Sequence, residues 1–200
     1  MNKTAALLKE IIENRRTIKP EEFNGKMIPD ETVKNILAGA NWAPTHGLTE
    51  PWRFIVFAGM EGVQQFGKLH AELYKQETPS EQFLQKKYDT LLHKPDHASH
   101  LIVIVMKRGD KENIPEKEEL AATACAVENI LLMASTYELA VYWGTGGMCY
   151  HPSLKKHFGL RDEDKVMGFL YMGYSDKPHP NGFRNTDIEA KTTWINASGS

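Results

Sequence analysis

The sequence predicts a single domain in which helices and strands are interleaved around a sheet of about four or more strands. The chain has 200 residues, a length that suits one domain. Short runs rich in β-branched and aromatic residues alternate with longer segments of helical periodicity. No internal repeat or linker interrupts this alternation. We therefore expect one domain over residues 1–196 and a disordered tail or cloning remnant at 197–200.

The first third of the chain predicts two helices and one strand. Apolar residues at helical spacing make residues 4–14 an amphipathic helix. A second helix is expected to start at Pro29-Asp30, with Asp30 as its N-cap. It should end before Pro44, because a residue that precedes proline avoids the α region. RFIVFA at 53–58 then has the composition of a strand.

The middle of the chain predicts a buried strand between helices. Apolar spacing indicates helices around 63–73 and 83–92. HLIVIVM at 100–106 is continuously apolar, which is typical of a strand buried on both faces. Residues 107–119 are charged and are expected to form a surface loop. The helical pattern of 118–140 is apolar on more than one side, so its own domain or a second subunit should cover it.

The last third predicts two further strands and a polar arm. AVYWG at 140–144 is a short strand, and 151–158 is a short helix before Gly159. KVMGFLYMGY at 165–174 is the last strand. The remaining residues are too polar to fold alone.

Composition excludes several classes of function. The net charge of −2 provides no general attraction for nucleic acid or an acidic membrane. No apolar run approaches the roughly 20 residues that span a bilayer, and the charged, amphipathic N-terminus lacks the apolar region of a signal peptide. Cys125 and Cys149 form neither a C-x-x-C pair nor a disulfide framework. We expect a soluble, cytoplasmic protein that binds neither nucleic acid nor membrane.

Two short motifs suggest a ligand. Arg15-Arg16-Thr17 follows the first helix, and paired guanidinium groups beside a hydroxyl suit a phosphate. The alternative is a solvated helix end, where cations complement the helix dipole. Gly144-Thr145-Gly146-Gly147 follows a strand, and its glycines allow backbone N–H groups to approach a ligand. The alternative is an ordinary tight loop, since Cys149 stands where G-x-G-x-x-G requires its third glycine.

Other polar residues favour structural interpretations. His93, His97 and His100 lack the cysteine or acid cluster expected of a metal site, so structural or solvent-facing roles are favoured. Glu128 lies in the apolar helix and is expected to be a buried or interfacial carboxylate with a hydrogen-bond partner. Neither cysteine has an activating motif, and no nucleophile system is visible.

The order of the motifs resembles the FMN-dependent nitroreductase family. Arg15-Arg16-Thr17, APTHGLTEPWRF at 43–54, YWGTGG at 142–147 and the final strand occur in sequence. The chain is most similar to the compact NAD(P)H nitroreductase branch, whose loop reads A-P-x-H…P-W-x-F. The resemblance implies an α+β fold with a mixed, mostly antiparallel sheet and helices on both faces. It also implies an intertwined homodimer with two FMN sites at the subunit interface.

The resemblance assigns provisional roles to particular residues. Trp52 should anchor the 43–54 loop in the core, and Glu50 should reach the polar edge of the flavin. Pro44, Thr45 and His46 should lie near the isoalloxazine. The phosphate and ribityl chain would be held by Arg15, Arg16 and Thr17, with Arg184 as a second phosphate contact. From the other subunit the ring would be approached by Trp143, Gly144, Thr145 and Gly146.

The implied chemistry belongs to the cofactor. NADH or NADPH would deliver hydride to flavin N5, and a nitroaromatic, quinone or similar planar acceptor would then be reduced in a ping-pong cycle. This scheme requires no conventional catalytic side chain and no metal. Glu50 departs from the amide common in relatives, because a carboxylate can only accept hydrogen bonds. The alternative function is a flavin-binding or redox-sensing module with little turnover.

Overall fold

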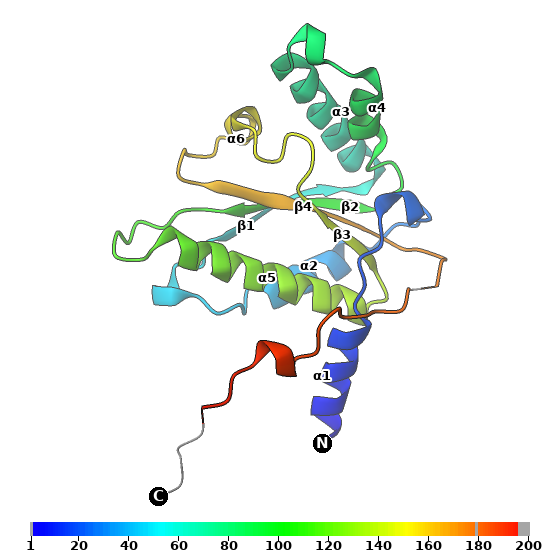
Figure 1. Cartoon of the computed structure of the whole chain (residues 1–200). Coiled ribbons are helices and arrows are strands. Elements are labelled where there is room, and N and C mark those ends of the chain that lie inside the picture. Colours follow the sequence, from blue (N-terminus) through cyan, green and yellow to red (C-terminus); the bar gives the residue numbers. More distant parts are fainter. Residues whose placement is uncertain (1, 179, 196–200) are drawn as a thin grey trace, which may run out of the picture.

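The computed structural model describes residues 2–178 and 180–195 and has an α+β architecture (Figure 1). The predicted tail at 197–200 lies outside the described residues. The helices and strands, in chain order, are α1 (Lys3–Asn14), α2 (Asp30–Ala40), β1 (Trp52–Ala58), α3 (Gly59–Glu77), α4 (Gln85–His93), β2 (His100–Met106), α5 (Glu116–Thr136), β3 (Ala140–Gly144), α6 (Pro152–His157) and β4 (Lys165–Gly173). Single 3₁₀ turns cover Pro20–Glu22, His46–Leu48, Ser80–Gln82 and Glu189–Lys191.

The sheet has four strands in the order β1-β2-β4-β3, and each neighbouring pair is antiparallel. The parallel pairing is an isolated bridge between Thr17 and Val141. It lies on the edge of β3 that faces away from β4. These pairings confirm the predicted α+β class and the mostly antiparallel sheet. The continuously apolar β2 is buried along its whole length between two neighbours, as its sequence predicts.

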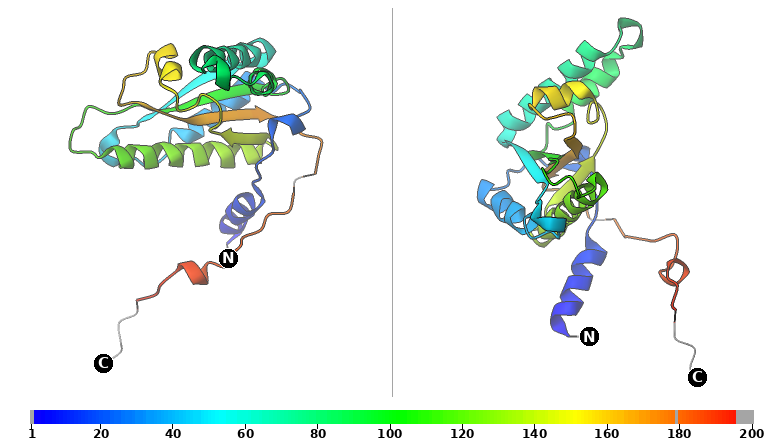
Figure 2. Two further views of the ribbon diagram at one scale, coloured as in Figure 1. Left: turned by 45° about the horizontal axis from the view of Figure 1, so that its top comes forward. Right: turned by 90° about the vertical axis from the view of Figure 1, so that its left-hand side faces the viewer.

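Helices cover both faces of the sheet. α2 and α5 lie on one face, and α3, α4 and α6 lie on the other (Figure 1; Figure 2, left). Successive side chains of β2 point to opposite faces of the sheet. Leu101 and Val103 belong to the hydrophobic cluster under α3, whereas Ile102 and Ile104 pack with α2 and α5. The domain therefore has two cores separated by one sheet.

Three predicted helix boundaries were wrong, two in α5 and one in α2. α5 begins at Glu116, inside the predicted surface loop, because Pro115 provides an extended N-cap and three glutamates in the first turn complement the helix dipole. It ends at Thr136 rather than 140, where Glu138 takes a left-handed conformation with φ of 56°. Asp30 is the first residue of α2 rather than its N-cap, which is Pro29.

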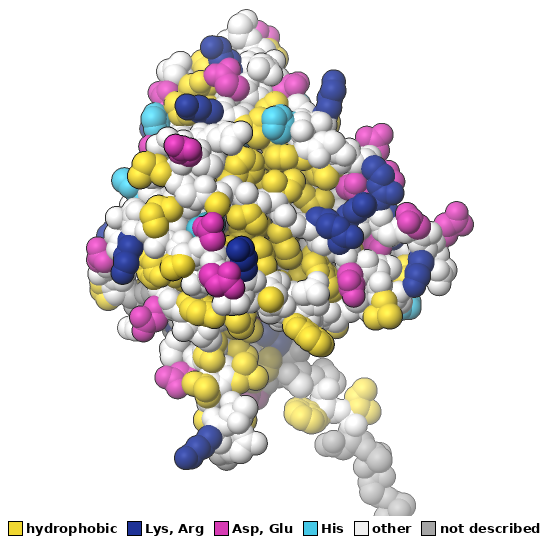
Figure 3. Space-filling view, turned by 180° about the vertical axis from the view of Figure 1, so that it is seen from behind, with side chains coloured by type: hydrophobic (Ala, Val, Ile, Leu, Met, Phe, Trp, Pro, Cys, Tyr) yellow, Lys and Arg dark blue, Asp and Glu magenta, His cyan; other side chains and the backbone are white. Residues whose placement is uncertain are grey.

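Both ends of the chain leave the body of the domain. α1 buries none of its residues, and Leu7 and Leu8 are 58% and 52% exposed. The C-terminal arm extends away from the sheet and its helices (Figure 2). Its Phe183 and Trp194 side chains are exposed. Seen from behind Figure 1, hydrophobic side chains also spread over the middle of the domain (Figure 3). Apolar surface on this scale is typical of an interaction site.

Within residues 2–178 and 180–195, no helix is both long and apolar enough to cross a membrane.

Candidate functional site

The Arg15-Arg16-Thr17 segment runs along the free edge of β3. Thr17 forms the parallel bridge with Val141, and the N–H of Ile18 donates to the carbonyl of Val141 at 3.1 Å. β3 is the outermost strand, so its other edge is free to accept this segment. The sequence folds this way because α1 ends at Asn14 and Arg15 turns into an extended conformation.

The two arginines have different surroundings. The guanidinium of Arg16 donates to the carbonyls of Glu13, Arg15 and Pro180 at 2.6, 2.7 and 2.9 Å. Arg16 thus closes the end of α1 and ties it to the C-terminal arm, which is the helix-end role considered above. The half-buried side chain of Arg15 makes no hydrogen bond to any described residue. Arg15 is therefore the guanidinium available to an anion.

A cavity of about 570 Å³ lies at the other end of β3. Its volume falls in the range of small-molecule sites. The indole of Trp143 is fixed as one wall, because its N–H donates to the carbonyl of Met167 at 3.1 Å. The lining is mostly apolar and consists of Glu116, Leu120, Trp143, Thr145, Cys149, Tyr150, Pro152, Lys155, Lys165, Val166 and Met167.

The glycine loop joins β3 to this cavity. Gly147 has φ of 67°, and a side chain added at Gly146 would meet no atom within 4 Å. The described hydrogen bonds include none donated by the backbone N–H groups of Thr145 or Gly146. These donors are therefore free for a ligand in the part of the chain that the structure describes.

The sequence analysis missed a residue behind this loop. The N–H of Met148 donates to Nε2 of His70 at 2.8 Å, and the His70 ring is only 2% exposed. Burial, aided by Lys94 and Lys87, lowers the pKa of His70 to about 4. The only sequence signal was a histidine among the apolar positions of the predicted helix 63–73. Burial also raises the pKa of the Cys149 thiol to about 12, which makes it a poor nucleophile.

The 44–50 loop is held by hydrogen bonds, and its backbone is strained at Glu50. Pro44 is exposed. The Thr45 hydroxyl lies 3.0 Å from that of Thr49 and accepts the N–H of Glu50 at 3.2 Å. Glu50 has φ of 42°, an uncommon value for a residue other than glycine. Arg53 donates to the Glu50 carbonyl at 2.7 Å and holds it there. Strain of this kind concentrates at ligand sites.

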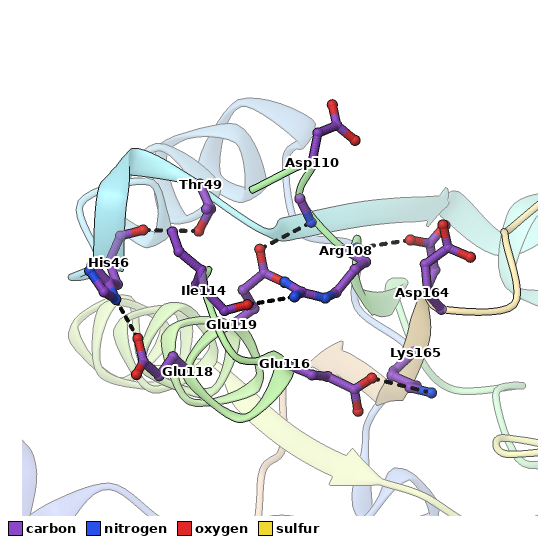
Figure 4. A network of polar contacts seen from close by, with 12 residues as sticks. His46, Thr49, Arg108, Asp110, Ile114, Glu116, Glu118, Glu119, Asp164 and Lys165 are labelled. Atoms are coloured by element: carbon purple, nitrogen blue, oxygen red, sulfur yellow. Dashed lines mark hydrogen bonds and ion pairs between the residues drawn. The ribbon is translucent and has the colours of Figure 1, made fainter. Parts of the chain in front are cut away.

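Side chains from other elements support the same loop. A ring nitrogen of His46 contacts the Glu118 carboxylate at the start of α5, and Lys111 donates to the carbonyl of Gly47 (Figure 4). Gly47 has no room for a side chain, because an added Cβ would lie 2.7 Å from Ile114. Trp52 is 5% exposed and donates to the Asn41 side chain at 3.0 Å. The prediction that Trp52 anchors the loop is confirmed.

A buried ion pair lies beneath the loop. Glu119 of α5 is 1% exposed and pairs with Arg108, which also donates to the carbonyl of Ile114 (Figure 4). The second oxygen of Glu119 accepts the N–H of Gly109 at 3.0 Å. The buried carboxylate of α5 is thus Glu119. Glu128 is exposed on this chain, because its side of the helix faces away from the sheet; an interfacial role for Glu128 stays a prediction.

The remaining polar candidates lie elsewhere. His100 is buried between the Ser99 hydroxyl at 2.9 Å and Asp30 at 3.1 Å, and His93 pairs with Asp96 at 2.9 Å. Their structural roles match the prediction, and His97 faces solvent. Arg184 is exposed and donates to the carbonyl of Phe183 at 2.9 Å, so its contact with a phosphate stays a prediction.

The strand order separates the candidate residues into two groups. The edge strand β3 brings Arg15, Thr17 and the glycine loop together on one side of the sheet. The 44–50 loop precedes β1, which forms the opposite edge. With three strand spacings between the edges, the two groups lie on the order of 14 Å apart. In one chain the two groups therefore lie at opposite edges of the sheet.

Known proteins of similar sequence extend over nearly the whole chain. YfhC of Bacillus subtilis, named as a candidate NAD(P)H nitroreductase, is 27% identical over 94% of this chain and 94% of its own length. YdjA of Escherichia coli K12, also named as a candidate NAD(P)H nitroreductase, is 29% identical over 72% of this chain and 75% of its own length.

Solved structures lead to the same family. A nitroreductase-like family protein from Bacillus cereus superimposes with a TM-score of 0.81 at 28% identity, covering 95% of this chain and 96% of that one. A candidate nitroreductase from Desulfovibrio desulfuricans, solved in complex with FMN, shares the fold with a TM-score of 0.67 at 20% identity, over 96% and 98% of the two chains. Residues 12–174 match the model of the Nitroreductase family. The chain therefore belongs to the nitroreductase family.

Proposed function

We propose that this protein is an FMN-dependent oxidoreductase that passes hydride from NADH or NADPH to a small planar acceptor such as a nitroaromatic or a quinone. One observation carries the proposal. The edge strand β3 has a free arginine near its start and a cavity with free backbone donors at its end. This spacing suits a ligand with an anionic tail and a ring system. The names of the relatives support NADH or NADPH as the reductant, and the FMN complex of a structural neighbour supports FMN as the cofactor.

The residues present fit FMN. Arg15 would hold the phosphate, with Thr17 beside it along the strand edge. The free N–H groups of Thr145 and Gly146 would donate to the acceptor atoms of the ring, and Trp143 would form an apolar wall. When bound, FMN supplies hydride transfer at N5. The side chains then have to bind, orient and exclude water, which agrees with the lack of an activated nucleophile.

The functional unit we propose is a homodimer. The 44–50 loop and the β3 edge lie on opposite sides of one sheet, so a complete site would combine the loop of one copy with the edge of another. α1 and the C-terminal arm expose apolar side chains that a second copy would cover. In this arrangement Glu50 would approach the flavin edge from the partner.

Replacing both Arg15 and Arg16 by alanine is expected to weaken FMN binding at least tenfold, because a charge-assisted hydrogen bond contributes about 1.5–3 kcal/mol. Since Arg16 is engaged by backbone carbonyls, Arg15→Ala alone should account for most of the loss. Flavin fluorescence titration measures the affinity. Lys34→Ala, which removes an exposed cation of α2, is the matched control and should bind normally. Unchanged affinity in the double variant, or a monomeric FMN-loaded protein in sedimentation, would contradict the proposal.

Glu50→Gln is expected to raise the reduction potential of bound FMN. A carboxylate at the flavin edge disfavours the reduced, negatively charged flavin, whereas an amide has no net charge and can also donate. Anaerobic potentiometry on the two holoproteins measures the difference. Glu61→Gln removes the same charge from the first turn of α3 and should leave the potential unchanged. An unchanged or lowered potential in Glu50→Gln would contradict the role given to this carboxylate.

The activity itself is tested with the holoprotein. Anaerobic NADH or NADPH should bleach its flavin absorbance, and a nitroaromatic or quinone should restore it over repeated cycles. Bleaching without turnover would favour the flavin-binding or redox-sensing module instead.

A further inference from the structure

We propose that His70 is a positioning residue for the glycine loop, holding Gly144–Met148 in the geometry through which the loop contacts its ligand. The inference goes beyond the cofactor assignment, although its ligand readout rests on the proposed function. His70 comes from α3, on the side of the sheet away from α5.

The first observation is a buried hydrogen bond. Nε2 of His70 accepts the N–H of Met148 at 2.8 Å, so this nitrogen carries no proton and a neutral ring has its proton on Nδ1. The ring is 2% exposed, which leaves little water to replace it as the acceptor. An unpaired buried N–H is costly. The imidazole therefore fixes the end of the loop where the chain leaves the site.

The second observation is packing around the same ring. The centroids of the Phe66 and Phe169 rings lie 5.3 and 5.2 Å from that of His70. Phe169 is the β-sheet partner of Gly144, the first residue of the loop. His70 thus contacts Met148 at one end of the loop and, at the other end, the strand residue that pairs with Gly144.

The third observation is that position 147 has room only for glycine. Gly147 has φ of 67°, and a Cβ there would lie 2.3 Å from Nε2 of His70. The backbone must come this close for Met148 to reach the imidazole. Thr145 and Gly146, with their free N–H groups, therefore lie between two fixed points. A site whose donors are held in place before binding loses less conformational entropy when the ligand arrives.

Protonation of His70 at Nε2 would break its hydrogen bond with the N–H of Met148. A protonated Nε2 would be a donor facing the donor of Met148. The charges that act on the ring are those of Lys87 in α4 and of Lys94, the C-cap residue of that helix, and both oppose protonation of the ring. Of the neighbouring titratable groups, the Cys149 thiol and the Tyr171 phenol have raised pKa values because they are buried, so they stay neutral in the range where His70 titrates.

The test compares His70→Leu, which puts an apolar side chain without an acceptor in place of the imidazole, with His70→Gln, whose amide oxygen can still accept. In His70→Leu we expect FMN affinity to fall about tenfold and exchange of the Met148 amide to speed up at least tenfold, as the loss of one buried hydrogen bond predicts. His70→Gln should restore both values to within about threefold of the wild type. His93→Leu removes an exposed histidine of α4 and serves as the control.

Each possible result either supports or overturns the role proposed for His70. Wild-type FMN affinity in His70→Leu overturns the proposal, and so does an equal loss in both His70 variants. If the wild type binds no FMN, the proposed function fails, whereas the Met148 exchange rates still decide the role of His70. If His70→Leu does not fold, the wild type and His70→Gln are compared as the pH falls toward about 4. Loss of Met148 protection in the wild type alone supports the proposal, and equal behaviour overturns it.

Discussion

Replacing Glu119 by alanine is expected to lower the free energy of unfolding by about 3–5 kcal/mol, because the change leaves the guanidinium of Arg108 without its buried partner. Glu119 is 1% exposed and also accepts the N–H of Gly109 at 3.0 Å. Alanine therefore removes the acceptor for an ion pair and for a backbone donor at the same time. The loss should far exceed that of an average single substitution, which is about 1 kcal/mol.

Urea denaturation at one protein concentration, followed by circular dichroism, measures this change. Glu31→Ala is the matched control, since Glu31 pairs with Lys34 at 3.6 Å in an exposed position and should lose at most about 1 kcal/mol. Replacing Arg108 and Glu119 together by leucine should recover part of the loss, because no buried charge is then left unpaired. A loss below about 1 kcal/mol in Glu119→Ala would contradict the importance of the pair.

The Arg108–Glu119 pair also links the core to the 44–50 loop. Arg108 donates to the carbonyl of Ile114, whose side chain packs against Gly47. Glu118, the next residue of α5, contacts His46 of the same loop (Figure 4). The first turn of α5 therefore supports the 44–50 loop by two routes, one through a buried pair and one at the surface.

Local patterns in the sequence predicted most of the fold. Six consecutive residues of β2 after His100 are apolar, and the burial of the strand on both faces follows from this composition. The start of α5 was missed because its first turn is charged, and periodicity does not distinguish a charged helix start from a surface loop. The sheet order depends on pairings between distant segments, which no local pattern contains.

The candidate site was predicted in part. The motifs at 15–17 and 143–147 were visible as residue types, and the structure places them at the two ends of β3. Their supporting residues were not visible. Glu119 and Glu128 are both glutamates of one helix, and which of them is buried depends on the side of α5 that packs on the sheet and on the position of Arg108. Likewise, nothing local connects His70 to Met148, since they meet only after α3 packs on the sheet.

The stability of the wild type should therefore depend on pH in a way that His70→Gln lacks. The pKa of His70 is about 4 in the folded chain and about 6.5 when unfolded, so below about pH 6.5 the unfolded state binds a proton that the folded state does not. This contribution to stability is complete above pH 6.5, is lost as the pH falls toward 4, and changes no further below that. A pKa difference of about 2.5, at about 1.4 kcal/mol for each pKa unit, gives about 3 kcal/mol.

Urea denaturation of the wild type and His70→Gln, at about pH 7 and about pH 4, isolates this contribution. The other ionisable groups are common to both proteins, so their effects cancel when the two are subtracted. We expect the stability of the wild type relative to His70→Gln to fall by about 3 kcal/mol between the two pH values. A constant difference would show that His70 has the same affinity for protons in the folded and unfolded chains, and burial next to Lys87 and Lys94 would then have no effect on its ionisation.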